Sequence, residues 1–189
     1  AQTGDHTLDI AQVPSSHTDG CSFSSDGKYI SFARVDRLHI CDAATGELAR
    51  TFQNNHGDIY GAIFSPSNEL IAAASENGLI TVWGTATGEE RLTLGIAGET
   101  TPCLAFDPDG RWIAAATQGE DTTDSMIRIW DVGTGRQLHE IELSVPRHGP
   151  LIVRFSWDGC CIAAVTKNHT ITLWDSETGN ELHTFSGHG

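Results

Sequence analysis

The stretch IRIWDVGTGRQLHEI, residues 127–141, alternates apolar and polar side chains up to Trp130 and Asp131. It then passes through Thr134 and Gly135 and alternates again. Alternation with a period of two is typical of a half-buried β-strand, and a Thr-Gly step between two such runs is typical of a turn. The stretch therefore predicts a β-hairpin.

The hairpin pattern recurs along the chain. Its four copies are HICDAATGEL at 39–48, TVWGTATGEE at 81–90, RIWDVGTGRQ at 128–137 and TLWDSETGNE at 172–181. The glycines of the Thr-Gly step, Gly46, Gly88, Gly135 and Gly179, are 42, 47 and 44 residues apart. A period of this length indicates a repeat architecture, in which each unit buries its apolar face against its neighbours.

A second landmark keeps the same period. It reads FSSDG at 23–27, FSPSN at 64–68, FDPDG at 106–110 and FSWDG at 155–159. Each copy is an aromatic residue followed by turn formers, so each is expected to end one strand and begin the next. The runs that follow, KYISFA, ELIAAAS, RWIAAAT and CCIAAVT, are short and β-like and share an isoleucine. Together the landmarks predict four antiparallel strands per unit and an all-β fold.

Composition and charge narrow the classes of function. Of the 189 residues, 39% are apolar and 19% are charged, as in ordinary soluble globular proteins. The formal net charge of -14 has the wrong sign for nucleic acid or an anionic membrane surface, so neither is expected as a partner. The longest apolar stretches, such as CCIAAV at 160–165, are too short to span a bilayer. The five cysteines form no CxxC pair, so reduced thiols and a cytoplasmic location are expected.

The units resemble WD40 repeats, whose pattern is a Gly-His pair, an FSPDG-like turn and a terminal Trp-Asp, and the resemblance covers essentially the whole chain. It implies a β-propeller, in which sheets stack radially as blades. We expect an all-β, partial WD40-like β-propeller of about four four-stranded antiparallel blades plus one extra N-terminal outer strand. The chain is expected to be a single domain, residues 1–189, with the leading outer strand at 1–12, blade 1 at 13–53, blade 2 at 54–95, blade 3 at 96–144 and blade 4 at 145–189.

The strand count indicates an incomplete propeller. DHTLDI at 5–10 matches an outermost strand, and the chain also ends with one, ELHTFS at 181–186. The resemblance implies about seven or eight blades in a closed domain, so four units indicate part of a longer array or a chain that pairs with a second copy. Open blade faces would expose more apolar surface than a monomer typically tolerates, and self-association is therefore expected.

The resemblance also implies a buried polar network in each unit, formed by a His before the first strand, a hydroxyl on the second, an Asp before the third and the Trp. The expected members are His56, Asn77 and Trp83 in the second unit, Asp124 and Trp130 in the third, and His148, Asn168 and Trp174 in the fourth. Ser75, Thr117 and Thr166 are the expected hydroxyl donors. Cys21 is interpreted as a small core residue, and Cys41 takes the place of Trp in the first unit. No two histidines have metal-ligand spacing, so no metal is expected.

Partner binding is expected on the rim that carries the loops between second and third strands. The third unit has an insertion there, QGEDTTDS at 118–125, whose acidic side chains suit a basic peptide. The candidate partner-binding residues are Glu120, Asp121, Asp124, Asn77, Arg147, Asn168 and His169. A solvated variable loop is the alternative interpretation. Calcium is a weaker alternative, because the spacing of the acids matches no full ligand loop.

The leading hypothesis is a non-enzymatic protein–protein interaction scaffold, a WD40-repeat segment of a larger protein that presents rim loops to peptide or protein partners. No catalytic residues and no cofactor are assigned. The alternative is a quinoprotein-like or hydrolytic propeller enzyme fragment, because adjacent cysteines such as Cys160 and Cys161 can form a strained disulfide beside a quinone cofactor. Reduced thiols at the start of a strand are the favoured interpretation of this pair.

Overall fold

The structure is a computed structural model that describes residues 21–119, 125–143, 152–165 and 170–186. These residues form sixteen β-strands in four four-stranded antiparallel sheets. The prediction of an all-β chain built from four four-stranded units is confirmed. The predicted outer strand at 1–12 lies outside the described residues, and the exact limits of the units stay predictions.

Each sheet contains four strands in chain order, so its first and fourth strands are its edges. The first sheet contains β1 (Cys21–Phe23), β2 (Tyr29–Arg34), β3 (Arg37–Asp42) and β4 (Leu48–Gln53). The second contains β5 (Ile59–Phe64), β6 (Leu70–Ser75), β7 (Leu79–Gly84) and β8 (Glu90–Gly95). The third contains β9 (Glu99–Phe106), β10 (Trp112–Gly119), β11 (Ser125–Asp131) and β12 (Gln137–Leu143). The fourth contains β13 (Ile152–Phe155), β14 (Cys161–Val165), β15 (Ile171–Asp175) and β16 (Glu181–Phe185).

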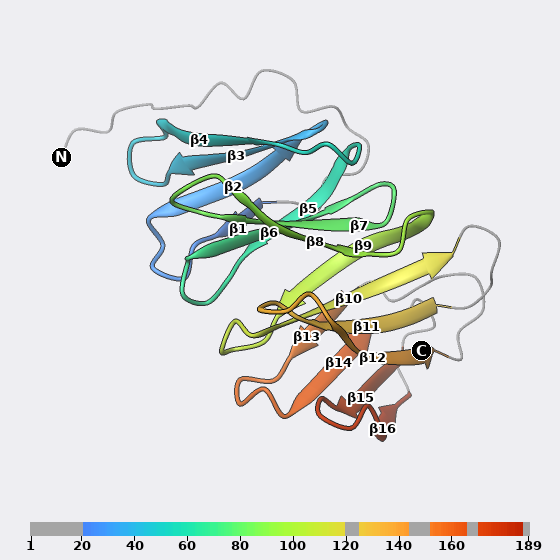
Figure 1. Cartoon of the computed structure of the whole chain (residues 1–189). Coiled ribbons are helices and arrows are strands. Elements are labelled where there is room, and N and C mark those ends of the chain that lie inside the picture. Colours follow the sequence, from blue (N-terminus) through green and yellow to red (C-terminus); the bar gives the residue numbers. More distant parts are fainter. Residues whose placement is uncertain (1–20, 120–124, 144–151, 166–169, 187–189) are drawn as a thin grey trace.

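The four sheets stack face to face in chain order, from the first sheet at the top of Figure 1 to the fourth at the bottom. Their first strands are in contact, β1 with β5, β5 with β9 and β9 with β13, and so line a shared inner edge. Among the described strands, none of the first sheet packs against one of the fourth. The described sheets therefore form an arc of blades.

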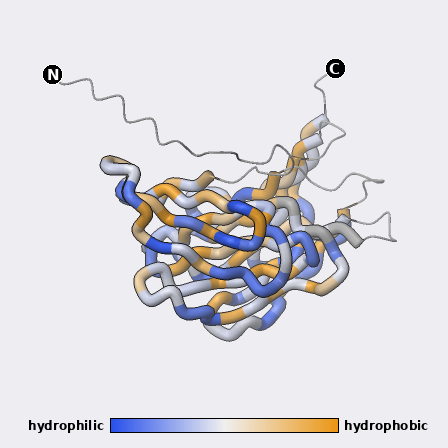
Figure 2. Tube along the Cα trace, turned by 90° about the horizontal axis from the view of Figure 1, so that it is seen from above, coloured by the Kyte–Doolittle hydropathy of each residue, from blue (hydrophilic) through white to orange (hydrophobic). Residues whose placement is uncertain are grey.

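The core consists of three layers between successive sheets. In each layer the face that carries the tryptophan of one sheet packs on the aliphatic face of the sheet before it. Trp83 is buried in this way against Phe52, with 5.6 Å between ring centroids. Because another sheet covers each face of the second sheet, its central strands β6 and β7 are buried and apolar over nearly their whole length. Figure 2 shows hydrophobic and hydrophilic segments interspersed along the tube.

The outer faces of the first and fourth sheets expose apolar side chains. Phe23 is 62% exposed on the first sheet and Phe185 is 55% exposed on the fourth. Cys21 is also exposed, so its interpretation as a core residue was wrong. Its counterparts Ala62 and Leu104 are buried because another sheet covers them, and no described sheet covers Cys21. These faces agree with the expected self-association, which stays a prediction.

Candidate binding rim

The turns of the sheets lie on two opposite sides of the stack, at the two ends of the strands (Figure 1). One end carries the turns between first and second strands and between third and fourth strands, and we call it the turn rim. Its residues are 24–28, 43–47, 65–69, 85–89, 107–111, 132–136, 156–160 and 176–180. The other end carries the turns between second and third strands and the links between sheets, and we call it the loop rim. The turn rim is described in full.

The residues predicted to bind partners belong to the loop rim. Of these only Asn77 is described, in the turn between β6 and β7. Its side-chain oxygen accepts a hydrogen bond from Leu79 N at 3.2 Å, and its carbonyl oxygen accepts one from Gly98 N at 3.0 Å. Asn77 therefore links the second sheet to the segment that leads into the third. The others lie outside the described residues: Glu120, Asp121, Asp124, Arg147, Asn168 and His169.

The buried polar network of the second sheet differs from the one expected at His56, Asn77 and Trp83. Asn54 is its centre: the side-chain amide donates to Ser75 Oγ at 2.8 Å and to Gly57 O at 2.7 Å. The Asn54 side-chain oxygen accepts a hydrogen bond from Thr81 Oγ1 at 3.2 Å. His56, two residues later, is half-buried and makes no hydrogen bond among the described residues. The Asn54 amide can make all three bonds because it has two N–H donors and an oxygen acceptor, whereas Trp83 serves sheet packing.

The third sheet has an ion pair at the corresponding place. Arg128 on β11 is buried, and its Nη1 donates to Glu99 Oε2 on β9 and to Thr117 Oγ1 on β10. Its Nε lies 3.4 Å from Glu140 Oε2 on β12, so the arginine joins all four strands. Trp130 and Trp174 are buried as expected, while Asp124, His148 and Asn168 lie outside the described residues. Arg128 was not among the residues predicted for this network, although the alternation along the strand places it on the same face as Trp130.

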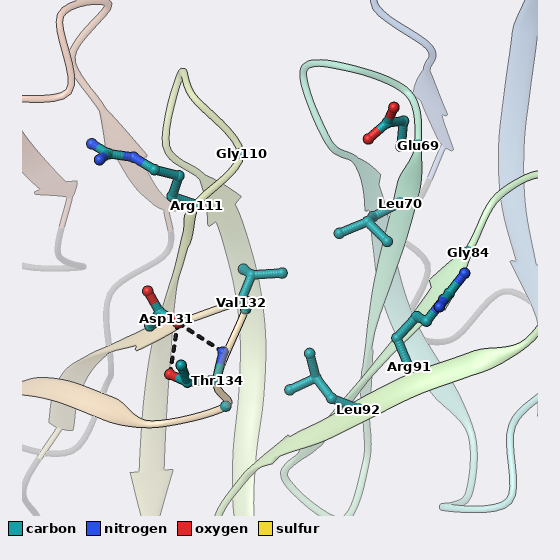
Figure 3. Close-up of a pocket in the computed structure, with 12 residues that line it drawn as sticks. Glu69, Leu70, Gly84, Arg91, Leu92, Gly110, Arg111, Asp131, Val132 and Thr134 are labelled. Carbon is teal, nitrogen blue, oxygen red and sulfur yellow. Dashed lines mark hydrogen bonds between the residues drawn. The ribbon is translucent and has the colours of Figure 1, made fainter.

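An open cavity of about 790 Å³ lies on the turn rim between the second and third sheets (Figure 3). Leu70, Leu92 and Val132 come from both sheets and point toward one another across it. Charged side chains of both signs, Glu69, Arg91, Arg111 and Asp131, line the rest. We call this space the rim cavity.

Arg91 reaches the rim cavity because of a local irregularity in β8. The ladder between β7 and β8 pairs Val82 with Leu92 and Trp83 with Glu90, so Arg91 is the extra residue of a β-bulge. A bulge bends the strand and redirects a side chain. The guanidinium lies over Gly84, since a Cβ built on that glycine would be 3.4 Å from Arg91 Nε. Gly84 stands where the other three sheets have the Asp that ends the third strand. Because it has no side chain, it leaves room for the guanidinium of Arg91.

The other turns of this kind keep their aspartate. In the third sheet, Asp131 Oδ1 accepts hydrogen bonds from Thr134 N at 2.8 Å and from Thr134 Oγ1 at 2.6 Å. These bonds, with that of the hydroxyl the strongest influence, lower the pKa of Asp131 below its ordinary value. Its carboxylate therefore stays charged at neutral pH, on the side of the rim cavity opposite Arg91 (Figure 3).

The cysteine pair gives no support to the enzyme alternative. All five cysteines are free, with Cys160 exposed in a turn and Cys161 at the first position of β14. No group of three or more potential metal ligands occurs within the described ranges. No helix of the described chain is long and apolar enough to cross a membrane.

The chain is similar in sequence to proteins that contain WD repeats. The family model WD40, described as "WD domain, G-beta repeat", matches residues 46–84 and 96–131. These ranges run from the Thr-Gly turn of the first sheet to the end of β7, and from the link before β9 to the end of β11. The matched segments therefore each contain the first three strands of a sheet.

Three curated relatives show the extent of the similarity. WD repeat-containing protein SL1-17 of Schistosoma mansoni is 24% identical over 157 residues, which are 82% of this chain and 50% of the relative. U3 small nucleolar RNA-associated protein 7 of Saccharomyces cerevisiae is 26% identical over 137 residues, 72% of this chain and 23% of that protein. Eukaryotic translation initiation factor 3 subunit I of Aspergillus fumigatus is 23% identical over 178 residues, 88% of this chain and 52% of that protein. The chain thus spans about half of the first and third relatives and less of the second.

Proposed function

Because the WD40 family model matches two segments of the chain, we propose that it is a WD40-repeat protein and a non-enzymatic protein-interaction module that binds segments of partner proteins on its turn rim. The printed names of the relatives support membership of larger assemblies: one is a subunit of an initiation factor and another is an RNA-associated protein. None of the three names states a catalytic activity. The proposed mechanism is docking on a rigid platform of blades.

The rim cavity is the observation that carries this proposal. Its volume of about 790 Å³ lies within the range of pockets that hold small ligands or single side chains of a partner. An apolar floor with a charged border resembles the centre and rim of protein interfaces. We therefore expect it to hold an aliphatic side chain of the partner, with polar neighbours of that side chain bound by Arg91 and Asp131.

A phage-displayed library of random peptides, selected on the full-length protein, tests the proposal. Selected peptides should share a central aliphatic residue. Leu92→Asp should abolish their binding because it places a charge on the cavity floor. Leu48→Asp is the matched control, since Leu48 is an exposed leucine on β4 outside the cavity. Peptides without an aliphatic consensus, or equal loss in both variants, would rule out the rim cavity as the docking site.

The loop rim stays a second proposed surface. The acidic insertion at 118–125 suits a basic partner, and changing Glu120, Asp121 and Asp124 to Ser should reduce capture of that partner. Undiminished capture would remove this surface from consideration. We also propose a cytoplasmic location, because the five cysteines form no CxxC pair and are expected to be reduced thiols.

A further inference from the structure

Trp157 is 98% exposed, more than any other large apolar side chain of the described residues. It lies in the turn between β13 and β14, at the position held by Pro66 and Pro108 in the two preceding turns. The turn does not need the indole. Gly159 N donates to Ser156 O at 2.9 Å and Ser156 Oγ donates to Asp158 at 2.6 Å, and proline-containing turns close in the same way. Trp157 is therefore explained better by binding than by folding.

A cavity of about 330 Å³ adjoins Trp157 between the turns of the third and fourth sheets. Trp112 also lines it, together with the carboxylates of Asp109, Asp175 and Glu177. Arg111 shows what this environment holds: its guanidinium is 5.7 Å from the Trp112 ring centroid, and its Nη2 is 3.3 Å from Asp109 Oδ2. A cation between an indole and a carboxylate is thus already present on one side of the cavity.

The Trp157 side has the same groups without such a cation. Asp158 uses Oδ1 to accept the hydrogen bonds of the turn from Ser156 and Cys160. The charge of Asp158, followed by smaller effects that include Asp175 and Glu177, raises the pKa of the Cys160 thiol. Arg111 is the only basic residue among those that line the cavity, so negative charge prevails there. The net charge of -14 acts in the same direction over longer distances.

We propose that Trp157, Asp158 and Glu177 form a docking site for a lysine or arginine side chain of a basic segment in a partner protein. The indole contributes a cation–π face, and the carboxylates neutralise the incoming charge. The site lies on the turn rim beside the rim cavity and depends on the proposed function only in needing a protein partner. The two sites differ in chemistry, one aliphatic and one cationic, so they can fail separately.

Fluorescence polarisation with the full-length protein tests the site. The probes are a peptide of alternating lysine and serine, its arginine counterpart, and a matched peptide of glutamate and serine. We expect both basic peptides to bind, the acidic peptide to remain free, and affinity to fall steeply with salt. Trp157→Pro should weaken binding by about tenfold or more, since the loss of an aromatic anchor typically has this effect. Glu177→Gln should weaken it by a smaller factor.

Two controls accompany this measurement: a check that Trp157→Pro folds, and the variant Leu92→Asp. Trp157→Pro reproduces the residue of the neighbouring turns, so it should fold, and an unchanged melting temperature checks this. Leu92→Asp should leave binding of the basic peptides unchanged, whatever it does to peptides selected on the rim cavity. The site is overturned if the basic peptides do not bind, or if Trp157→Pro binds them as tightly as the wild type.

Discussion

The second and third sheets share strand order, turn types and packing, yet they fill the same internal position with different chemistry. Thr81 and Arg128 occupy equivalent places, opposite Ala73 on β6 and Ala115 on β10. Around Thr81 the network is neutral and centred on Asn54. Around Arg128 it is an ion pair with Glu99. One fold therefore accepts either an amide or a charge pair at this position, and the arginine keeps its charge paired although its Nε makes no hydrogen bond.

The two solutions differ in what happens when one member is removed. An amide network loses neutral hydrogen bonds, and hydroxyl groups can rotate toward other acceptors. An ion pair leaves an uncompensated charge in a region from which water is largely excluded. Removing one member of the network should therefore destabilise the third sheet more than the second, although the intact ion pair adds little net stability.

The largest effect is expected for Arg128→Ala. It leaves Glu99, whose side chain is only 18% exposed, without its cation. The free energy of unfolding should fall by about 3–5 kcal/mol, as for other broken buried pairs. Urea denaturation followed by circular dichroism measures the change.

The double variant Arg128→Met with Glu99→Gln is the control for this comparison. It removes both charges and keeps similar volumes, so it should recover a large part of the lost stability. If Arg128→Ala costs less than about 1 kcal/mol, in the range of an exposed salt bridge, then the pair is not buried as described.

A smaller loss, about 1–3 kcal/mol, is expected for Asn54→Ala, because Ser75 and Thr81 lose their buried hydrogen-bond partner. His56→Ala sharpens the comparison. It should change stability by less than about 0.5 kcal/mol, as for residues outside a buried network. The reverse order of the two effects, measured by urea denaturation, would restore His56 as the centre of the network.

The fold could be predicted from the sequence because its signals are local. The aromatic-turn landmark and the Trp-Asp-Thr-Gly hairpin specify strand ends within a few residues, and the period of two specifies which residues share a face. The choice of Asn54 over His56 could not be predicted, since both lie in the link before β5. A register shift in the ladder of β5 and β6, between Ile59 and Gly61, changes how that link enters the sheet.

The rim cavity and the Trp157 site depend on how two sheets meet, which no local pattern states. Their residues nevertheless left signals in the repeat: Gly84 stands where the other turns have Asp, and Trp157 stands where two turns have Pro. Arg128 was also detectable in the sequence, as a basic residue on the buried face of a strand. Its partner Glu99 is 29 residues away, and only the structure brings the two together.

The smallest expected effect concerns the turns of the same two sheets, Asp131 in the third and Gly84 in the second. Hydrogen bonds from Thr134 lower the pKa of Asp131 in the folded protein. The carboxylate therefore contributes its full stabilisation above the ordinary pKa of an aspartate, about 4. This stabilisation is lost as the pH falls through the lower pKa of the folded state. Asp131→Ala should therefore be less stable than the wild type at neutral pH, and the difference should shrink toward about pH 2. Urea midpoints at the two pH values measure it. Asp131→Asn, which keeps an oxygen acceptor without the charge, should retain part of the stability and lose the pH dependence of this group. An equal deficit of Asp131→Ala at both pH values would mean that the ionised carboxylate stabilises the turn of the third sheet no more than the neutral acid does, and would contradict the lowered pKa.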